Sequence, residues 1–204
     1  TSMLADLGAE VIKIELPGRG DDSRFFGPHK DGESAYFLLL NRDKRSLTVD
    51  MKSPEGLALI RDLAAKSDVL VENFRPGVTK RLGLDYDAIR ALNPDIVYAS
   101  INGFGQDGPM ADQPALDLCV QAITGLMSLT GPRDGSPHAV GESVADVATG
   151  MFAAFGIMAA LFERERSGEG RFLEVAMFDS IFSMLLTSLS AVLYMGGDPA
   201  RVGN

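Results

Sequence analysis

One carboxylate stands at the start of a long apolar segment. Asp146 lies in the run Ser143–Ala148, ahead of a stretch rich in alanine, glycine and other apolar residues that extends to Arg166. In the first turn of a helix a carboxylate is stabilised in its ionised form, and small neighbours leave room for a substrate. An ionised, poorly hydrated carboxylate can act as a nucleophile. An aspartate that only caps its helix fits the same pattern, so the residues leave both interpretations open.

Basic residues gather where loops should leave a parallel sheet. Arg24 follows a glycine- and aspartate-containing segment, and the other cations flank predicted strands: Arg42, Lys44, Arg45, Lys52, Arg75 and Arg81. Ligand crevices lie at the carboxyl ends of parallel strands, so several of these side chains together could hold the phosphates of a nucleotide. A rim of solvated surface charges is the alternative.

A glycine-rich run has the spacing of a dinucleotide-binding loop. Gly103–Gly108 follows a predicted strand, but Pro109 comes directly after it and the next residues do not start an amphipathic helix. A bound phosphate would therefore lack a helix N-terminus. We interpret the run as an ordinary glycine-rich loop, and a nucleotide-dependent dehydrogenase stays as an alternative.

The histidines and the cysteine do not form a predicted site. His29 and His138 each lie near proline and glycine, so we expect them in solvated loops, and no metal-ligand spacing is present in the sequence. Cys119 sits among apolar residues without a cationic neighbour, so we expect it to be buried as a small hydrophobe. No metal site is predicted.

Composition narrows the class of protein. The chain has 204 residues, 46% of them hydrophobic, and a net charge of −9, which argues against a general nucleic-acid-binding surface. A single cysteine and the absence of a signal-like start favour a reducing, cytoplasmic setting. The longest apolar stretch, Val147–Phe162, is shorter than the ~20 residues that a membrane span needs, so it predicts a core helix and no membrane association.

The elements that must position these residues alternate along the chain. Strands are predicted at residues 11–16, 46–50, 69–72, 96–101 and 171–177, and helices at 53–66, 85–92, 116–129, 144–166 and 179–194. Residues 1–8 are typical of the end of a helix closed by a glycine. The pattern predicts one α/β domain with a mostly parallel, incomplete sheet, and further elements before residue 1 and after residue 204.

Five segments, in order, resemble the family III CoA-transferases, the group that includes formyl-CoA and carnitine CoA-transferases. These segments are Leu4–Glu15, Asn41–Ser46, Asp50–Gly56, Val71–Gly77 and Ser167–Arg171. The resemblance implies that residues 1–204 are the large CoA-binding domain, a Rossmann-like parallel sheet with flanking helices. The family's first strand, small domain and returning C-terminal segment would lie outside these residues. Members of this family form interlocked homodimers.

The resemblance also implies an activity and a site. An acyl-CoA and a small carboxylic acid would exchange CoA through a mixed anhydride and an aspartyl-CoA thioester on Asp146, without a metal or redox cofactor. The residues implied in CoA binding are Arg24, Val49, Asp50, Met51, Lys52, Asn73, Phe74 and Arg81. The acids exchanged stay open.

One position departs from the family pattern. Leu116 lies where such transferases often place a tyrosine and where acyl-CoA racemases place a histidine. A racemase needs two groups that flank the α-carbon, and an apolar side chain cannot move a proton. CoA transfer is therefore preferred, and a racemase or epimerase of the same superfamily and a non-catalytic CoA-binding homologue stay as alternatives.

Overall fold

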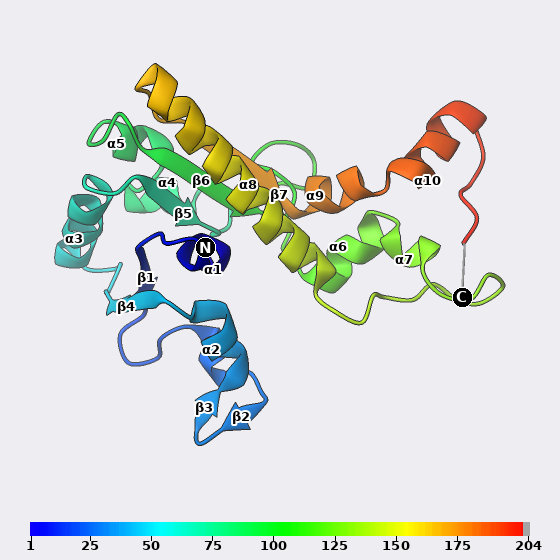
Figure 1. Cartoon of the computed structure of the whole chain (residues 1–204), viewed down its shortest axis with the longest axis horizontal. Coiled ribbons are helices and arrows are strands. Elements are labelled where there is room, and N and C mark those ends of the chain that lie inside the picture. The colour runs from blue at the N-terminus through cyan, green and yellow to red at the C-terminus, as the bar shows by residue number, and fades with distance from the viewer. Residues whose placement is uncertain (202–204) are drawn as a thin grey trace.

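The computed structural model describes residues 1–201 and shows a mixed α/β architecture (Figure 1). The strands are β1 Val11–Glu15, β2 His29–Lys30, β3 Glu33–Ser34, β4 Lys44–Thr48, β5 Val69–Glu72, β6 Val97–Asn102 and β7 Phe172–Ala176. The helices are α1 Ser2–Asp6, η1 Asp22–Phe25, α2 Ala35–Asn41, α3 Pro54–Ala64, α4 Val78–Leu82, α5 Tyr86–Arg90, α6 Asp117–Ile123, α7 Leu126–Leu129, α8 Val144–Ser167, α9 Met177–Met184, α10 Leu186–Ser190 and the π-helix η2 Ala191–Met195.

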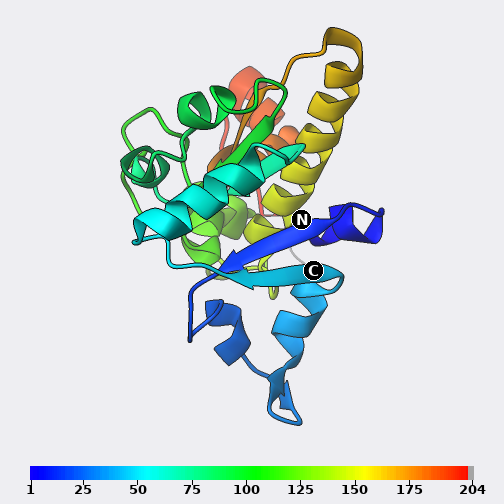
Figure 2. The same cartoon turned by 90° about the vertical axis from the view of Figure 1, so that its left-hand side faces the viewer.

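The strands form two parallel sheets and one short hairpin. β1 pairs in parallel with β4, and β5, β6 and β7 form a three-stranded parallel sheet in that order. β2 and β3 make an antiparallel pair below α2, away from both parallel sheets (Figures 1 and 2). The parallel α/β prediction is confirmed, but the prediction of one sheet is wrong for the described residues, because no ladder joins β4 to β5. Periodicity identifies strands, whereas pairing between distant strands is a tertiary property.

A common apolar core joins the two parallel sheets. Val49, directly after β4, is buried with Ile96 and Tyr98 at the start of β6, and Ile14 of β1 packs against the same cluster. The hydroxyl of Tyr98 donates a hydrogen bond of 2.9 Å to the carbonyl oxygen of Leu84, so this buried phenol has a polar partner. The loops that follow the strands are therefore held on one packed unit.

Helix α8 connects β6 to β7 and covers both strands (Figure 1). Its buried face is made of small side chains, and a Cβ at Gly156 would lie 2.8 Å from the side chain of Leu173 in β7. Because α8 ends at Ser167 and the chain then enters β7, the helix runs antiparallel to that strand. The first turn of α8 therefore lies at the edge where the parallel strands end.

Two predicted helices are interrupted. The segment 116–129 forms α6 and α7, because Gly125 has a φ of +87°, which a right-handed helix does not allow. The segment 179–194 forms α9, α10 and η2, with a break at Leu185. The predicted end of a helix over residues 1–8 is confirmed, since α1 is followed by Gly8 with a φ of +100°.

The outer face of α8 carries an exposed apolar stripe. Its members recur every three or four residues and are 49–75% exposed: Val147, Met151, Phe155, Met158 and Phe162. By length and composition α8 is apolar enough to cross a membrane, a property that core helices share, and 39% of its most apolar window is buried within the fold. The predicted core helix is thus confirmed on one face only.

Candidate active site at the start of helix α8

Asp146 lies in the first turn of α8, and the residue as a whole is exposed, although neighbouring groups partly desolvate its carboxyl group. Within residues 1–201 this carboxyl group has no hydrogen-bond partner, so Asp146 does not cap its own helix. Its backbone N–H donates a hydrogen bond of 3.0 Å to Oδ2 of Asp117, and the N–H of Ala145 donates to the same oxygen at 2.7 Å. Asp117, 29 residues earlier in the chain, therefore satisfies the amides that α8 leaves unpaired.

Asp117 is itself held in place by a buried amide. Nε2 of Gln121, one turn further along α6, donates a hydrogen bond of 2.5 Å to Oδ1 of Asp117. Oε1 of Gln121 accepts the N–H of Val140 at 2.9 Å, and Gln121 is only 1% exposed. Both carboxylate oxygens of Asp117 are thus occupied, and the segment that leads into α8 is tied to α6.

Burial raises the pKa of the Asp146 carboxyl, and the neighbouring negative charge of Asp117 raises it further. This direction is opposite to that expected from the first helical turn alone. A carboxylate with a raised pKa is a stronger base and a stronger nucleophile once ionised.

The glycine-rich loop after β6 borders the first turn of α8. Phe104 of this loop packs against the cluster that contains Ala145 and Ala148, on either side of Asp146. At the other end of the loop, the N–H of Gln106 donates a hydrogen bond of 2.7 Å to Oε1 of Glu174 in β7. No helix starts between this loop and Asp117, which agrees with the interpretation as an ordinary loop.

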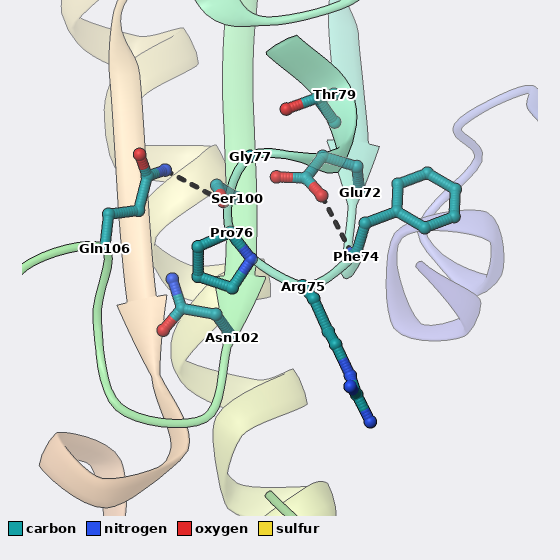
Figure 3. Close-up of a pocket in the computed structure, with 9 residues that line it drawn as sticks. All are labelled: Glu72, Phe74, Arg75, Pro76, Gly77, Thr79, Ser100, Asn102 and Gln106. Carbon is teal, nitrogen blue, oxygen red and sulfur yellow. Dashed lines mark hydrogen bonds between the residues drawn. The ribbon is translucent and has the colours of Figure 1, made fainter. Parts of the chain in front are cut away.

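A small polar pocket lies at the carboxyl ends of β5 and β6, on the other side of the same loop (Figure 3). Its lining residues are Glu72, Phe74, Arg75, Pro76, Gly77, Thr79, Ser100, Asn102 and Gln106. Nε2 of Gln106 donates a hydrogen bond of 3.3 Å to the hydroxyl of Ser100, and the N–H of Phe74 donates one of 2.8 Å to Oε2 of Glu72. The loop 103–108 therefore lines this pocket through Gln106 and packs near the start of α8 through Phe104.

Most of the predicted CoA residues follow the carboxyl ends of two parallel strands, β4 and β5. Val49, Asp50, Met51 and Lys52 follow β4, Asn73 and Phe74 follow β5, and Arg81 lies in α4. Val49 is 4% exposed and belongs to the core, so only its backbone is available for a ligand. Asp50, Lys52, Asn73, Phe74 and Arg81 are exposed.

Arg24 forms an ion pair that connects the end of β1 to the following loop. Its Nε and Nη2 donate hydrogen bonds of 2.8 and 2.9 Å to the carboxylate of Glu15, whose side chain is 1% exposed. The guanidinium also lies 3.8 Å from the ring centre of Phe37. Glu15 accepts the N–H of Val49 through its backbone oxygen, so Arg24 and the segment after β4 meet at the end of β1.

Within the described residues, no hydrogen bond or ion pair connects the three sets of predicted CoA residues to one another or to Asp146. Two other cations are paired with carboxylates, Arg42 with Asp6 and Arg45 with Glu10 at 2.8 Å. Both pairs lie on the exposed surface.

The remaining candidates have different environments. His29 lies in β2 and His138 in a loop, and both are exposed. Cys119 is exposed, so the prediction that it is buried is wrong: α6 turns its Val120 and Gln121 inward instead. Residues 1–201 contain no group of three or more His, Cys, Asp or Glu side chains that could hold a metal ion.

Sequence reasoning missed Asp117 and Gln121. They are the polar residues of α6, spaced one helical turn apart among apolar neighbours. That spacing was a usable signal, because i and i+4 side chains meet on one helix face. The sequence did not show that these two residues bind the start of α8.

The parallel sheets, with polar loops at the carboxyl ends of their strands and a carboxylate at a helix start, define a parallel α/β protein. The chain belongs to the CoA-transferase family III, whose family model matches residues 1–204.

Named relatives and a solved structure resemble the whole chain. It is 46% identical over 205 residues to the acetyl-CoA:oxalate CoA-transferase of Acetobacter aceti, covering 100% of this chain and 53% of the relative. It is 45% identical over 181 residues to the succinyl-CoA:glutarate CoA-transferase of Homo sapiens, covering 88% and 41%. A crystal structure of a CAIB/BAIF family protein from Brucella suis superposes with a TM-score of 0.94 at 42% identity, covering 98% of this chain and 54% of that one. The chain spans about half the length of these proteins.

Proposed function

We propose that the protein to which this chain belongs transfers CoA from an acyl-CoA to a carboxylic acid, with Asp146 as the nucleophile. The observation that supports this most directly is the carboxyl group of Asp146. It is partly desolvated and has no hydrogen-bond partner within residues 1–201, at the edge where the parallel strands end. Family membership supports the reaction class, and the unpaired carboxyl group supports the choice of Asp146.

The proposed chemistry has two acyl transfers in each half-reaction. A carboxylate oxygen of Asp146 attacks the thioester carbonyl, the C–S bond breaks, and CoA leaves as a thiolate, which gives a mixed anhydride. The thiolate then attacks the aspartyl carbonyl and the donor acid leaves as its carboxylate, which gives an aspartyl-CoA thioester. The acceptor acid reverses these steps. The enzyme mainly supplies position, since thioester, anhydride and carboxylate exchange readily once they are held together.

The raised pKa of Asp146 fits this role. Burial and the nearby Asp117 charge destabilise the ionised carboxylate, so the free energy of the ground state rises relative to an acylated, neutral Asp146. Acylation removes that negative charge. The same environment that raises the pKa therefore favours forming the acylated intermediates.

The loops with the predicted CoA residues are proposed to bind the nucleotide. Arg24, Lys52 and Arg81 would meet phosphates, and Phe74 offers an exposed ring beside the pocket of Figure 3. In Arg24, Nη1 has no hydrogen-bond partner within residues 1–201, while Glu15 occupies the other two nitrogens. This cation is thus already oriented before a ligand arrives.

A small dicarboxylate is the proposed acceptor class. The relatives with 45–46% identity are named for oxalate and glutarate. The test is steady-state transfer from succinyl-CoA to a panel that contains oxalate, glutarate and monocarboxylates of matched length. Preference for a monocarboxylate would overturn the acceptor class.

The experiment for the nucleophile is covalent trapping. Full-length protein is incubated with succinyl-CoA, treated with hydroxylamine or borohydride and mapped by peptide mass spectrometry, and we expect the modification on the peptide that contains Asp146. Asp146→Asn should carry no modification and retain CoA binding. Asp87→Asn is the matched control, because Asp87 is an exposed acid in the first turn of α5. A label elsewhere, or CoA transfer by Asp146→Asn, would overturn the assignment of Asp146. No label on any peptide, despite CoA binding, would favour a racemase-like or non-catalytic member.

We also propose that the full-length protein is a homodimer. The apolar stripe on α8 supports this, because contiguous exposed apolar faces mark contact surfaces. Light scattering of the full-length protein should give twice the chain mass. A monomer at micromolar concentration would overturn this assembly.

A further inference from the structure

We infer that Asp117 is a positioning residue for Asp146, and that Gln121 sets the orientation of Asp117. This inference rests on the proposed function of Asp146. It assigns a role to two residues of α6 that touch no substrate: they hold the backbone of the nucleophile, and with it the direction of its carboxyl group.

The hydrogen bonds form a chain with one consistent direction. The amides of Ala145 and Asp146 both donate to Oδ2 of Asp117, at 2.7 and 3.0 Å. Oδ1 of Asp117 accepts from Nε2 of Gln121 at 2.5 Å, and Oε1 of Gln121 accepts from the N–H of Val140 at 2.9 Å. Every donor in this chain meets an acceptor, so the arrangement has one low-energy state.

Two features distinguish this chain of hydrogen bonds from an ordinary helix cap. Ser143, the residue at the N-cap position of α8, makes no side-chain capping hydrogen bond, so the unpaired amides depend on a side chain from another helix. Gln121 is buried, so neither it nor the inner oxygen of Asp117 can exchange its partner for water without cost. The start of α8 is therefore fixed relative to α6 and not by its own residues.

The consequence for the reaction is geometric. The backbone amide that Asp117 holds belongs to the nucleophile itself, so any drift of α8 at this point moves the attacking oxygen. A misplacement of about 1 Å can lower turnover by about 100-fold without a change in substrate binding. Asp117 should therefore affect kcat and leave the KM for the acyl-CoA almost unchanged.

A hydrogen-bond swap provides the test, in the full-length protein. In Asp117→Asn, the buried Gln121 must leave either the new amide or the N–H of Val140 without an acceptor. In Gln121→Glu, two carboxylates face each other. In the double variant, the side-chain amide introduced at position 117 accepts the two α8 amides through its oxygen and donates to the carboxylate introduced at position 121. That carboxylate still accepts the N–H of Val140, so the pattern is restored except for the weak bond of 3.4 Å that Nε2 of Gln121 donates to the carbonyl oxygen of Glu142.

We expect each single variant to lose about 10- to 100-fold in kcat, with KM for succinyl-CoA within about threefold, and the double variant to recover to within about threefold of the wild type. Asp85→Asn is the control, because Asp85 caps α5 in the same manner, by accepting the N–H of Ala88 at 3.3 Å, far from Asp146 along the chain. It should retain the wild-type kcat. CoA binding by each variant shows that it is folded.

Several results would overturn the inference. Single variants with a wild-type kcat, a double variant as slow as the singles, or a loss confined to KM each contradict a positioning role. Asp146→Asn is measured in parallel: if it turns over, the proposed function fails, whereas an inactive Asp146→Asn beside normal Asp117→Asn removes only the role of Asp117.

Discussion

The two halves of the chain have different structural roles. Residues 1–102 carry the predicted CoA loops on short parallel strands, and the ion pairs beside the first of these loops are local, Arg24 with Glu15 and Lys13 with Asp21. Residues 117–195 are mostly helical and apolar, and their key polar contact joins Asp117 to Asp146 across 29 positions. The first half offers cations for a nucleotide, and the second offers one carboxylate held from a distance.

This difference indicates which parts of the structure set the affinity for the ligand and which set the orientation of the nucleophile. Binding residues at the ends of strands need only the right loop, because the sheet brings the loops to one edge. A nucleophile needs a defined direction, and direction is set by packing between helices. Variants in the two halves should therefore separate affinity from turnover.

The largest expected effect is on turnover in the second half. Asp146→Asn removes the attacking oxygen, and we expect kcat to fall by about a thousandfold or more while the Kd for CoA stays within about threefold. Stopped-flow transfer and calorimetric CoA binding check both values. A parallel loss of CoA affinity would contradict the separation of binding in the first half from turnover in the second.

The next effect is on stability in the first half. Glu15→Gln leaves Arg24 without its charge partner, and we expect a loss of about 2–3 kcal/mol in the free energy of unfolding, reduced from that of a fully buried pair because Arg24 is partly solvated. Urea unfolding of the full-length protein measures it. An unchanged midpoint would mean that the pair contributes nothing.

The same pair has a pH signature. Hydrogen bonds from Arg24 are the largest cause that lowers the pKa of Glu15, to about 2, against the opposing effect of burial. The stabilisation is present above the unfolded-state pKa of 4.5 and is lost as the pH falls through about 2. Between those values, the wild type should lose stability on acidification more steeply than Glu15→Gln. Equal slopes would contradict the assignment.

A smaller effect concerns affinity alone. Phe74→Ala removes an exposed ring beside the pocket of Figure 3, and we expect the Kd for CoA to rise by about tenfold with little change in kcat, since stacking a base on a ring contributes about 1–3 kcal/mol. Leu92→Ala, which truncates an exposed apolar side chain just after α5, is the matched control. Similar effects from both variants would argue against a specific role of Phe74.

The smallest effect is a shift in the pH profile. Burial first, and the charge of Asp117 second, raise the pKa of Asp146, so the acidic limb of kcat should lie above the ordinary range of an aspartate. The residual activity of Asp117→Asn should show that limb at lower pH, because the like charge is gone. The acids on neighbouring segments, Glu142 and Asp179, stay in place in this variant. A limb that moves to higher pH would contradict the cause.

The sequence by itself determined the local features. The five strands of the parallel sheets, α3 with its Ser53 cap and α8 with Asp146 in its first turn were predicted, because capping residues and apolar periodicity act within a few residues. The short pair β2 and β3 was not predicted. The order of five segments was enough to identify the family. The sequence also identified the basic residues of the first half, but not the carboxylates with which they pair.

Only the tertiary structure decided the rest. Separate pairing of β1 with β4, the exposure of Cys119 and the hold of Asp117 on Asp146 depend on which distant surfaces pack together. The pKa of Asp146 followed the same rule: its place in the first turn predicted a stabilised charge, but burial and a carboxylate from α6 reversed the direction. Short-range forces set the elements, and the contacts between elements set the direction and the charge of the group that reacts.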